Sequence, residues 1–353
     1  MGELQVSAAT EARDFLSSYD GKKVRIMEVC GTHTHEIFKD GIRQILSPQI
    51  ELISGPGCPV CVTPADYIDE AVMLALEKNC TITTFGDLVR VPGSEKSLAD
   101  ARADGARVKV VYAPQDAALY AAEHPDEDVV FLSVGFETTV PSECLAVQQA
   151  IEKGLKNFLL LTANKTMPQA YLAMKDATDA FLYPGHVHAI IGTSVCEKLR
   201  DDYGISGVCA GFTPSELLVA LALEVKGLSK EKPFFINAYP RVVKPEGSPK
   251  AVALTRKYME PVDALWRGIG EIKGSGLALR DDYADFDARK KYSLPHITGR
   301  DNPACRCGEV LQGKCTSAEC PLFGKTCTPE HPVGACMVSS EGACSAYYLY
   351  GRQ

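Results

Sequence analysis

Short apolar runs alternate with helical patterns from about residue 24 to residue 243. Most of these runs are continuously apolar, which is typical of strands that helices cover on both faces. The pattern therefore predicts an α/β fold with parallel sheets. The expected strands span residues 24–29, 51–54, 81–85, 108–113, 128–135, 157–162, 189–193, 207–211 and 233–239.

Two of the expected helices begin with nearly the same four residues, TPAD at 63–66 and TPSE at 213–216. Each offers an N-cap hydroxyl, a proline at the first helical position and an acid three residues after the threonine. The similarity suggests two similar, Rossmann-like α/β domains. We expect them to span residues 1–125 and 126–243, with the segment HPDED at 124–128 at their boundary.

The pattern changes after residue 243. A helical stretch is expected over residues 251–270, followed by a charged segment at 280–292 and a tail rich in Cys, Gly and Pro with little periodicity. Such a tail buries too little apolar surface to fold alone, so it needs a metal centre or docking onto the α/β body. We expect residues 244–353 to form a small third domain.

Composition and charge narrow the choice of partners. The 353 residues include 37 Lys and Arg against 45 Asp and Glu, a formal net charge of -8, with 46% hydrophobic and 23% charged residues, as in an average globular protein. The negative charge argues against nucleic acid or an anionic membrane as the main partner. The longest apolar runs fall short of the roughly 18 residues of a membrane span. Because the N-terminus also lacks a secretory pattern, we expect a cytoplasmic protein.

Cysteine usage then points to metal or redox chemistry, because disulfide scaffolds belong to oxidising compartments. The chain has 14 cysteines. Seven are spread over the first 304 residues, and the other seven lie between Cys305 and Cys344. This distribution indicates two different tasks.

The motif CGTHTH at residues 30–35 follows an expected strand and opens an expected helix. Cys30 is thereby placed at the carboxyl edge of a sheet, the usual ligand position in open α/β folds. Helix-end amides and nearby imidazoles are expected to lower the pKa of its thiol and favour the thiolate, which binds metals and attacks electrophiles. The alternative is a buried small hydrophobic residue with capping histidines, His33 and His35. Gly31 and the polar run after Cys30 favour an exposed turn instead.

The motif GPGCPVC at residues 55–61 lies between an expected strand and an expected helix. A Cys-x-x-Cys pair directly before a helix permits a short disulfide and is often redox-active. A zinc knuckle is the main alternative, but it needs a second ligand pair nearby. We therefore expect Cys58 and Cys61 to form a redox dithiol.

The cysteine-rich tail has enough thiols for a metal centre, either an iron-sulfur cluster or a Cys-ligated zinc. Structural zinc sites usually use two tight Cys-x2-4-Cys knuckles, whereas the spacings here are long and uneven. A [4Fe-4S] cluster is therefore favoured over zinc and over unliganded surface cysteines. Cys305 competes with Cys307 for one ligand position, and Cys315 and Cys336 are spare.

Other polar residues follow expected strands, but each is weaker evidence. Glu137 in GFETT lines the same rim or caps the helix at Pro141. A structural role is at least as plausible as a functional one for His186, His188, Asn237 and Arg241. The sequence shows no phosphate-binding loop with its Lys-Ser/Thr pair, no Gly-x-Gly-x-x-Gly after a strand and no nucleophile elbow.

Taken together, these motifs are similar to those of the hydrogenase maturation factor HypD family. The resemblance rests on MEVCGTHTHEIF, GPGCPVCVTP, GFETT and the tail from CRCGEV to CSAYYLYG, and it covers essentially the whole chain. It implies two similar α/β domains and a third domain with a [4Fe-4S] cluster. It also implies assembly of the Fe(CN)2CO moiety of the [NiFe]-hydrogenase active site, together with the small chaperone HypC and the cyanide donor HypE.

The resemblance further implies a role for particular residues. Cys30 corresponds to the iron-binding thiol, with a HypC cysteine as the second thiolate. Cys58 and Cys61 correspond to the redox pair. His33 and His35 are expected to donate protons or hydrogen-bond around the iron, because two thiolates and three diatomic ligands already fill five positions. The implied cluster ligands are Cys307, Cys320, Cys327 and Cys344.

Two other functions compete with this interpretation. An iron-sulfur dependent thiol-disulfide oxidoreductase would use the cluster to reduce the Cys58–Cys61 pair, but it gives Cys30 and its histidines no task. A structural scaffold with a zinc-bound tail leaves both N-terminal motifs without a role.

Overall fold

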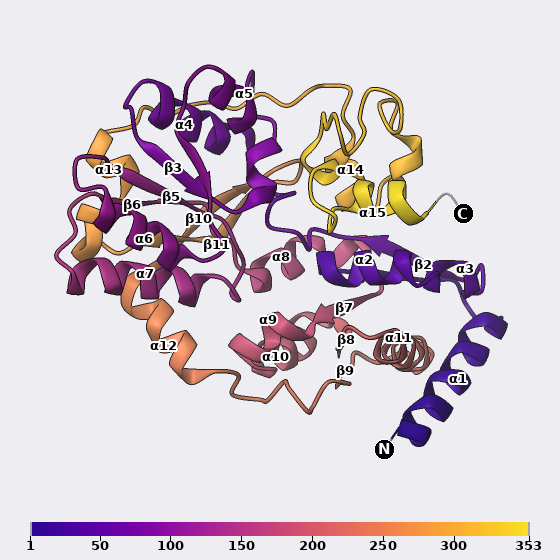
Figure 1. Cartoon of the computed structure of the whole chain (residues 1–353). Helices are drawn as coiled ribbons and strands as arrows, with labels where there is room; N and C mark the ends of the chain where they lie inside the picture. The colour runs from indigo at the N-terminus through magenta and orange to yellow at the C-terminus, as the bar shows by residue number, and fades with distance from the viewer. Residues whose placement is uncertain (1, 352–353) are drawn as a thin grey trace.

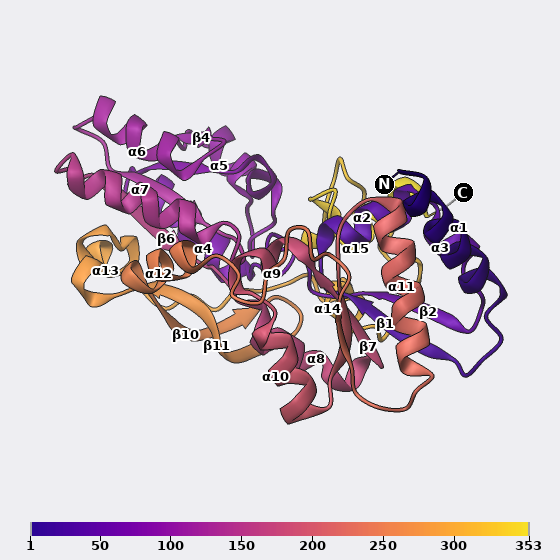
Figure 2. The same cartoon turned by 90° about the horizontal axis from the view of Figure 1, so that it is seen from below.

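The chain is described by a computed structural model, and the structure describes residues 2–351. Two parallel sheets lie side by side, each covered by helices on both faces, and a C-terminal segment contacts both (Figures 1 and 2). This arrangement confirms the predicted α/β class with a cysteine-rich C-terminal region.

The first sheet has five parallel strands in the order β2-β1-β7-β8-β9. Its strands are β1 (Val24–Glu28), β2 (Ile50–Ser54), β7 (Ala180–Pro184), β8 (Ser206–Ala210) and β9 (Phe235–Asn237). One face packs against α1 (Gly2–Ser18), α2 (Gly31–Lys39), α3 (Ile42–Ile45) and α11 (Pro214–Leu228). The other packs against α8 (Met167–Met174), α9 (Gly185–Ile191), α10 (Ser194–Tyr203) and part of the tail; a 3-10 turn, η2, spans Lys175–Ala177.

The second sheet has four parallel strands in the order β4-β3-β5-β6. Its strands are β3 (Thr81–Thr84), β4 (Val108–Val110), β5 (Val129–Ser133) and β6 (Phe158–Thr162). Helices α4 (Ala65–Leu76) and α5 (Leu98–Ala103) pack on one face, and α6 (Pro114–Glu123) and α7 (Val140–Glu152) on the other. The 3-10 turn η1 spans Gly86–Arg90.

The division of the chain between the sheets differs from the expected one. After β2 the chain leaves the first sheet, builds the whole second sheet and returns as β7, which pairs with β1 through Met27 and Phe181. The expected boundary between residues 125 and 126 therefore falls inside the second α/β unit. The prediction assumed that strands adjacent in sequence share a sheet, whereas here a long-range pairing closes the first one.

One expected strand is wrong. Residues 189–191 end helix α9, and the strand of this region is β7, which comes before that helix. A short apolar run does not distinguish a buried helix from a strand, because periodicity cannot be read over so few positions.

The expected helix over residues 251–270 is correct only in its first half. Helix α12 (Pro249–Tyr258) ends three residues before Pro261, which cannot continue a helix. The chain then forms β10 (Met259–Trp266), which pairs with β11 (Gly270–Leu279) in an antiparallel hairpin.

The rest of the chain consists of short elements that dock onto both α/β units. They are η3 (Asp281–Phe286), α13 (Ala288–Tyr292), α14 (Cys307–Leu311), η4 (Ser317–Glu319), η5 (Ala335–Met337) and α15 (Ala343–Tyr350). Helix α15 lies beside α2 of the first unit, at the upper right of Figure 1. Apolar residues of the tail share a buried cluster with the first sheet, so docking accounts for part of its order.

The two similar helix starts adopt different structures. Thr213 is the N-cap of α11 and accepts a hydrogen bond from the Glu216 N–H, while the Glu216 carboxylate accepts from the Thr213 N–H, a complete capping box. Helix α4 instead begins at Ala65, and the hydroxyl of Thr63 donates to the Pro59 carbonyl. The expected cap at Thr63 is therefore wrong.

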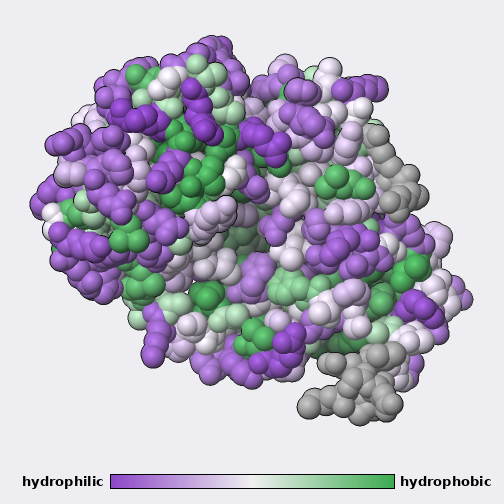
Figure 3. Space-filling model, viewed as in Figure 1, coloured by the Kyte–Doolittle hydropathy of each residue, from purple (hydrophilic) through white to green (hydrophobic). Residues whose placement is uncertain are grey.

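Residues 2–351 include no helix with both the length and the apolar character required to cross a membrane. Hydrophilic residues dominate the face in Figure 3, and hydrophobic residues lie between them in separate patches.

Candidate functional site

Cys30 lies where β1 ends and α2 begins, as predicted. It is the N-cap residue of α2, with extended backbone, and its side chain is 1% exposed. The loop of the second motif packs directly on it, since the Gly31 N–H donates to the Gly57 carbonyl at 2.8 Å. A Cβ atom at Gly57 would lie 2.1 Å from the Cys30 nitrogen, so only glycine fits there. The CGTHTH and GPGCPVC motifs thus form one interlocked edge of the first sheet.

The histidine nearest to the Cys30 sulfur comes from a different part of the chain. The Nε2 atom of His186, in the first turn of α9, lies 3.9 Å from the Cys30 sulfur. The ring of His186 stacks on Phe212, with centroids 5.1 Å apart. Burial lowers the pKa of His186 to about 4, so its imidazole is neutral at physiological pH.

The two histidines of the motif itself point elsewhere. The Nε2 atom of His33 hydrogen-bonds the Gly211 carbonyl at 2.9 Å, while its Nδ1 atom is buried and has no partner in the part of the chain that the structure describes. Burial and the nearby His186 lower the pKa of His33 to about 3. The Nδ1 atom of His35 lies 3.0 Å from the Ser340 carbonyl, so His35 helps to dock the tail.

The expected lowering of the Cys30 pKa is wrong. Burial raises the pKa of its thiol to about 12, with a smaller contribution in the same direction from the Glu341 carboxylate. The amide groups of Thr32 and His33 act in the predicted direction, but the loss of hydration outweighs them. Cys30 is therefore a neutral thiol in the structure, and it needs a bound cation to become a thiolate.

Cys58 and Cys61 are close together in the loop before α4, where the Cys61 N–H lies 3.4 Å from the Cys58 sulfur. Both are free thiols, 4% and 1% exposed. The Cys61 thiol also interacts with the thiol of Cys336, which in turn interacts with that of Cys307. The Cys336 thiol acts to lower the pKa of Cys61, but the Cys58 thiol and burial raise it well above its usual value. A continuous series of thiols thus joins the N-terminal pair to the tail.

The expected cluster ligands of the tail gather around the end of this series. The thiol of Cys307 interacts with those of Cys305 and Cys344 as well as that of Cys336. The sulfurs of Cys305 and Cys307 both lie against Gly334, where a Cβ atom would be 2.6 Å and 2.5 Å away. Buried apolar side chains surround Cys320, Cys327 and Cys344.

The donor set of the tail consists of thiols, the ligand type of iron-sulfur clusters. Within residues 2–351, no three His, Cys, Asp or Glu side chains are arranged to hold one metal ion. A four-iron cluster is ligated at its corners, so its thiolates stand farther apart than the ligands of one ion. A cavity of about 220 Å³ borders Cys305 and Cys307, and the buried guanidinium of Arg267 lines it. That cation acts to lower the pKa of Cys305, although the Cys307 thiol and burial raise it overall.

Glu137 belongs to the other sheet. It follows β5, and its Oε1 atom accepts a hydrogen bond from the Met167 N–H at the start of α8, 2.9 Å away. It therefore binds the start of α8 rather than that of α7, where the cap at Pro141 was expected. Its Oε2 atom is buried with no partner among the described residues, and burial raises its pKa to about 7. Glu137 thus lies at the connection between the two α/β units.

Comparison with known proteins agrees with this arrangement. A family model named HypD, described as the hydrogenase formation hypA family, matches residues 7–351. The chain belongs to the HypD family. Among its relatives, the hydrogenase maturation factor HypD of Escherichia coli is 42% identical over 97% of this chain and 93% of its own.

Other relatives extend the comparison. The hydrogenase expression/formation protein HupD of Azotobacter chroococcum is 42% identical over 94% of this chain and 90% of its own. A putative hydrogenase expression/formation protein of Methanocaldococcus jannaschii is 39% identical, over 94% and 93%. This HypD-family chain is therefore a hydrogenase maturation factor.

The sequence-based prediction gave two residues of this HypD-family site no specific role. His186 was one of several polar residues after strands, and its distance of 156 residues from Cys30 hid their contact. Cys336 was counted as spare, yet it is fully buried between Cys61 and Cys307.

Proposed function

We propose that this chain is the scaffold on which the Fe(CN)2CO moiety of a [NiFe]-hydrogenase is assembled, together with a HypC-type chaperone and a HypE-type cyanide donor. Membership of the HypD family supports a role in hydrogenase maturation. The site supports the chemistry, because one edge of the first sheet combines a candidate iron anchor, Cys30, with a candidate electron source, the Cys58–Cys61 pair.

The iron moiety is the cargo, and Cys30 is the proposed anchor. An iron that carries cyanide and carbonyl ligands is soft, and thiolate is a suitable ligand for it. The high pKa of Cys30 means that the empty site holds a neutral thiol, so iron binding must displace its proton. We assign His186 the task of orienting the sulfur, because its Nε2 atom lies 3.9 Å from the sulfur. A cysteine of the HypC-type partner would supply a second thiolate.

The contacts of Cys336 carry the proposed electron path. Passing from dithiol to disulfide, the Cys58–Cys61 pair gives up two electrons and two protons. The Cys336 thiol lies between this pair and Cys307, so thiol contacts continue to the tail. We propose that electrons reach the N-terminal pair along this series.

A [4Fe-4S] cluster bound in the tail would supply single electrons. The resemblance assigns its ligands to Cys307, Cys320, Cys327 and Cys344. The contacts of Cys307 with Cys336 favour its use in the thiol series, which would leave Cys305 as the fourth cluster ligand. Arg267 beside Cys305 would offset part of the negative charge of the thiolates.

The burial of the dithiol weighs against the competing function. A thiol-disulfide oxidoreductase must present a sulfur to a protein disulfide, because exchange proceeds by direct attack on sulfur. Cys58 and Cys61 are both almost fully buried. Cys30 is buried to the same degree, so the oxidoreductase is disfavoured mainly because it gives Cys30 and its histidines no task.

Infrared spectroscopy with iron analysis tests the proposal. The full-length protein, purified anaerobically with its HypC-type partner, is expected to show cyanide and carbonyl stretches and more iron than a cluster alone accounts for. Cluster iron without these bands would favour the oxidoreductase, and zinc alone would favour a structural tail.

A further inference from the structure

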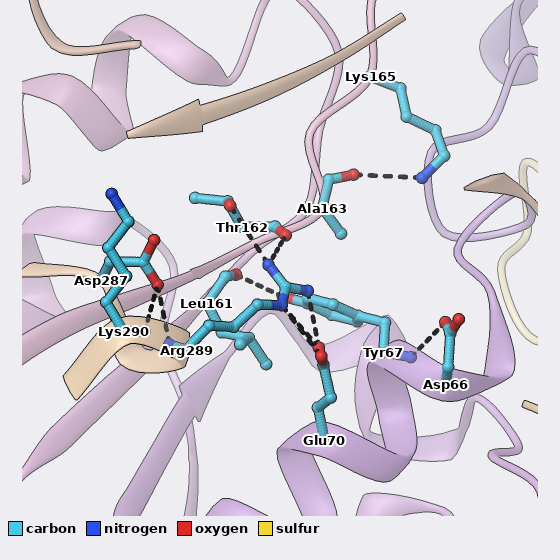
Figure 4. A network of polar contacts seen from close by, with 10 residues as sticks. All are labelled: Asp66, Tyr67, Glu70, Leu161, Thr162, Ala163, Lys165, Asp287, Arg289 and Lys290. Carbon is cyan, nitrogen blue, oxygen red and sulfur yellow. Dashed lines mark hydrogen bonds and ion pairs between the residues drawn. The ribbon is translucent and has the colours of Figure 1, made fainter. Parts of the chain in front are cut away.

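The carboxyl edge of the second sheet carries a polar cavity that the thiol site does not use (Figure 4). The cavity has a volume of about 230 Å³. It lies between the end of β6, the start of α4, the β10–β11 hairpin and α13. Open α/β sheets bind their ligands at this edge.

Lys165 is the buried cation of this cavity. It follows β6, and its side chain is 2% exposed. In the described part of the chain, its Nζ atom makes one hydrogen bond, a long one of 3.3 Å to the Ala163 carbonyl. A lysine ammonium has three donors. A buried charge with most of its donors unused is costly, which is why it points to a missing partner.

A second cation, Arg289, hydrogen-bonds a neighbouring backbone carbonyl. The Nη1 atom of Arg289 donates to the Thr162 carbonyl at 2.7 Å, one residue before the carbonyl that Lys165 contacts. The other side of the guanidinium forms three hydrogen bonds with Glu70. Burial lowers the pKa of Lys165 to about 7, and the positive charge of Arg289 acts in the same direction. An anion between two such cations would relieve their repulsion.

The carboxylates around the cavity do not fill this role. Glu70 is already paired with Arg289, and Asp263 on β10 accepts a hydrogen bond from the Gly274 N–H. Asp66 accepts from the Tyr67 N–H and acts on Lys165 only through its charge. Lys165 is therefore the buried charged group of this cavity whose hydrogen-bond donors are mostly unused.

We propose that this cavity binds a small oxyanion, a phosphate or carboxylate group, between Lys165 and Arg289. The ligand would occupy the second sheet at the position that the thiol site occupies on the first. The inference does not depend on the iron chemistry, because none of these residues belongs to the thiol site.

The only tryptophan of the chain offers a direct readout. The Lys165 ammonium lies 5.8 Å from the ring centroid of Trp266, which is fully buried. The full-length protein is titrated with inorganic phosphate, bicarbonate and acetate at constant ionic strength, following Trp266 fluorescence and heat. At least one anion is expected to bind saturably, and the preferred anion distinguishes a phosphate from a carboxylate ligand.

Three variants locate the site. Lys165→Met is expected to weaken binding by at least about tenfold, because the buried donor is lost. Lys153→Met, which removes an exposed lysine after α7, should leave the affinity unchanged. Asp66→Asn, measured at pH 6 so that Lys165 stays protonated, should tighten binding about threefold, since it removes the facing negative charge.

Calorimetry in two buffers adds a readout that does not depend on these variants. Anion binding should raise the pKa of Lys165, so the complex takes up protons near pH 7.5. The proposal is wrong if none of the three anions binds saturably, or if Lys165→Met binds as well as the unmodified protein. Weaker binding by Asp66→Asn would also contradict it, and this variant decides the matter if Lys165→Met does not fold.

Discussion

The two sheets carry their polar residues at equivalent edges, yet the chemistry of the edges is opposite. At the first sheet, Cys30 is a neutral thiol beside the neutral imidazole of His186. At the second, Lys165 and Arg289 lie near carboxylates. The shared topology explains where each site lies, because strands of a parallel sheet end at one edge. The side chains at that edge decide whether it suits a soft metal or an oxyanion.

The largest expected effect is loss of the tail's metal centre. Cys320→Ala or Cys327→Ala should abolish the visible absorbance of the proposed cluster. Either variant should also unfold much of the tail, because metal binding supplies part of the folding free energy of such segments. Iron content and proteolysis of the tail measure this. Cys315→Ala is the matched control, since Cys315 is only partly buried and is expected to be spare.

Variants of Cys305 and Cys307 then decide the remaining ligand. If Cys305 is the ligand, Cys305→Ala loses the cluster and Cys307→Ala keeps it. The reverse result would restore the ligand set implied by the family resemblance. If Cys315→Ala loses the cluster while Cys305→Ala and Cys307→Ala both keep it, neither Cys305 nor Cys307 is the fourth ligand.

The second expected effect concerns the iron cargo alone. Cys30→Ala should keep the cluster and the HypC-type partner but lose the cyanide and carbonyl bands completely. Cys30→Ser should not restore them, because a neutral hydroxyl is a poor ligand for soft iron. Full bands in Cys30→Ala would place the iron elsewhere. His186→Gln should retain Cys30 but weaken the bands, which separates orientation of the sulfur from ligation by it.

The third prediction tests the connection between the tail and the N-terminal pair. Cys336→Ser should keep the cluster and the Cys58–Cys61 dithiol, while re-reduction of that pair slows by at least about tenfold, because its thiol contact is lost. Thiol counting over time after mild oxidation measures this rate. Cys209→Ser is a matched control, since Cys209 is also a fully buried cysteine but lies on β8. An unchanged rate in Cys336→Ser would remove Cys336 from the path.

Local sequence was sufficient to predict the parts of the site that one segment builds. The placement of Cys30 between a strand and a helix was correct, and so was the position of the Cys58–Cys61 pair before α4. These features depend on residues within a few positions of one another. The predicted pKa of Cys30 was wrong because burial is a property of the whole fold, which the helix start alone does not reveal.

Contacts between distant segments could not be predicted from the sequence. The return of the chain to the first sheet depends on β7 pairing with β1, and that same return brings His186 to Cys30. Cys336 meets Cys61 only because the tail docks across the first unit. Neither contact has a periodic or spacing signal, since both join segments that are more than 100 residues apart.

The fourth prediction concerns pH and the second sheet. Burial raises the pKa of Glu143 to about 7 from an ordinary 4.5, and its Oε1 atom has no hydrogen-bond partner within residues 2–351. The folded state thus binds this proton more tightly than the unfolded state. Its stabilising contribution is therefore full below pH 4.5 and is lost as the pH rises through 7. Glu143→Gln should abolish this pH dependence, which amounts to about 3 kcal/mol of unfolding free energy at most.

Urea unfolding at pH 5 and pH 8 measures this difference. The exposed Glu123→Gln should leave the pH dependence as it is. If the free energy of unfolding of Glu143→Gln falls between pH 5 and pH 8 as much as that of the unmodified protein, Glu143 is ionised in the folded protein.

The smallest expected effect concerns the helix start at Thr213, which is capped, unlike the similar sequence at Thr63. Thr213→Ala removes the side-chain cap of α11 and should lower the free energy of unfolding by about 1 kcal/mol. Ser215→Ala, two residues further into the same helix, should change it by less than about 0.5 kcal/mol. Urea unfolding of the three proteins at one pH measures both values. Equal effects would show that the capping hydrogen bond contributes nothing measurable, although the geometry of the Thr213–Glu216 box is complete.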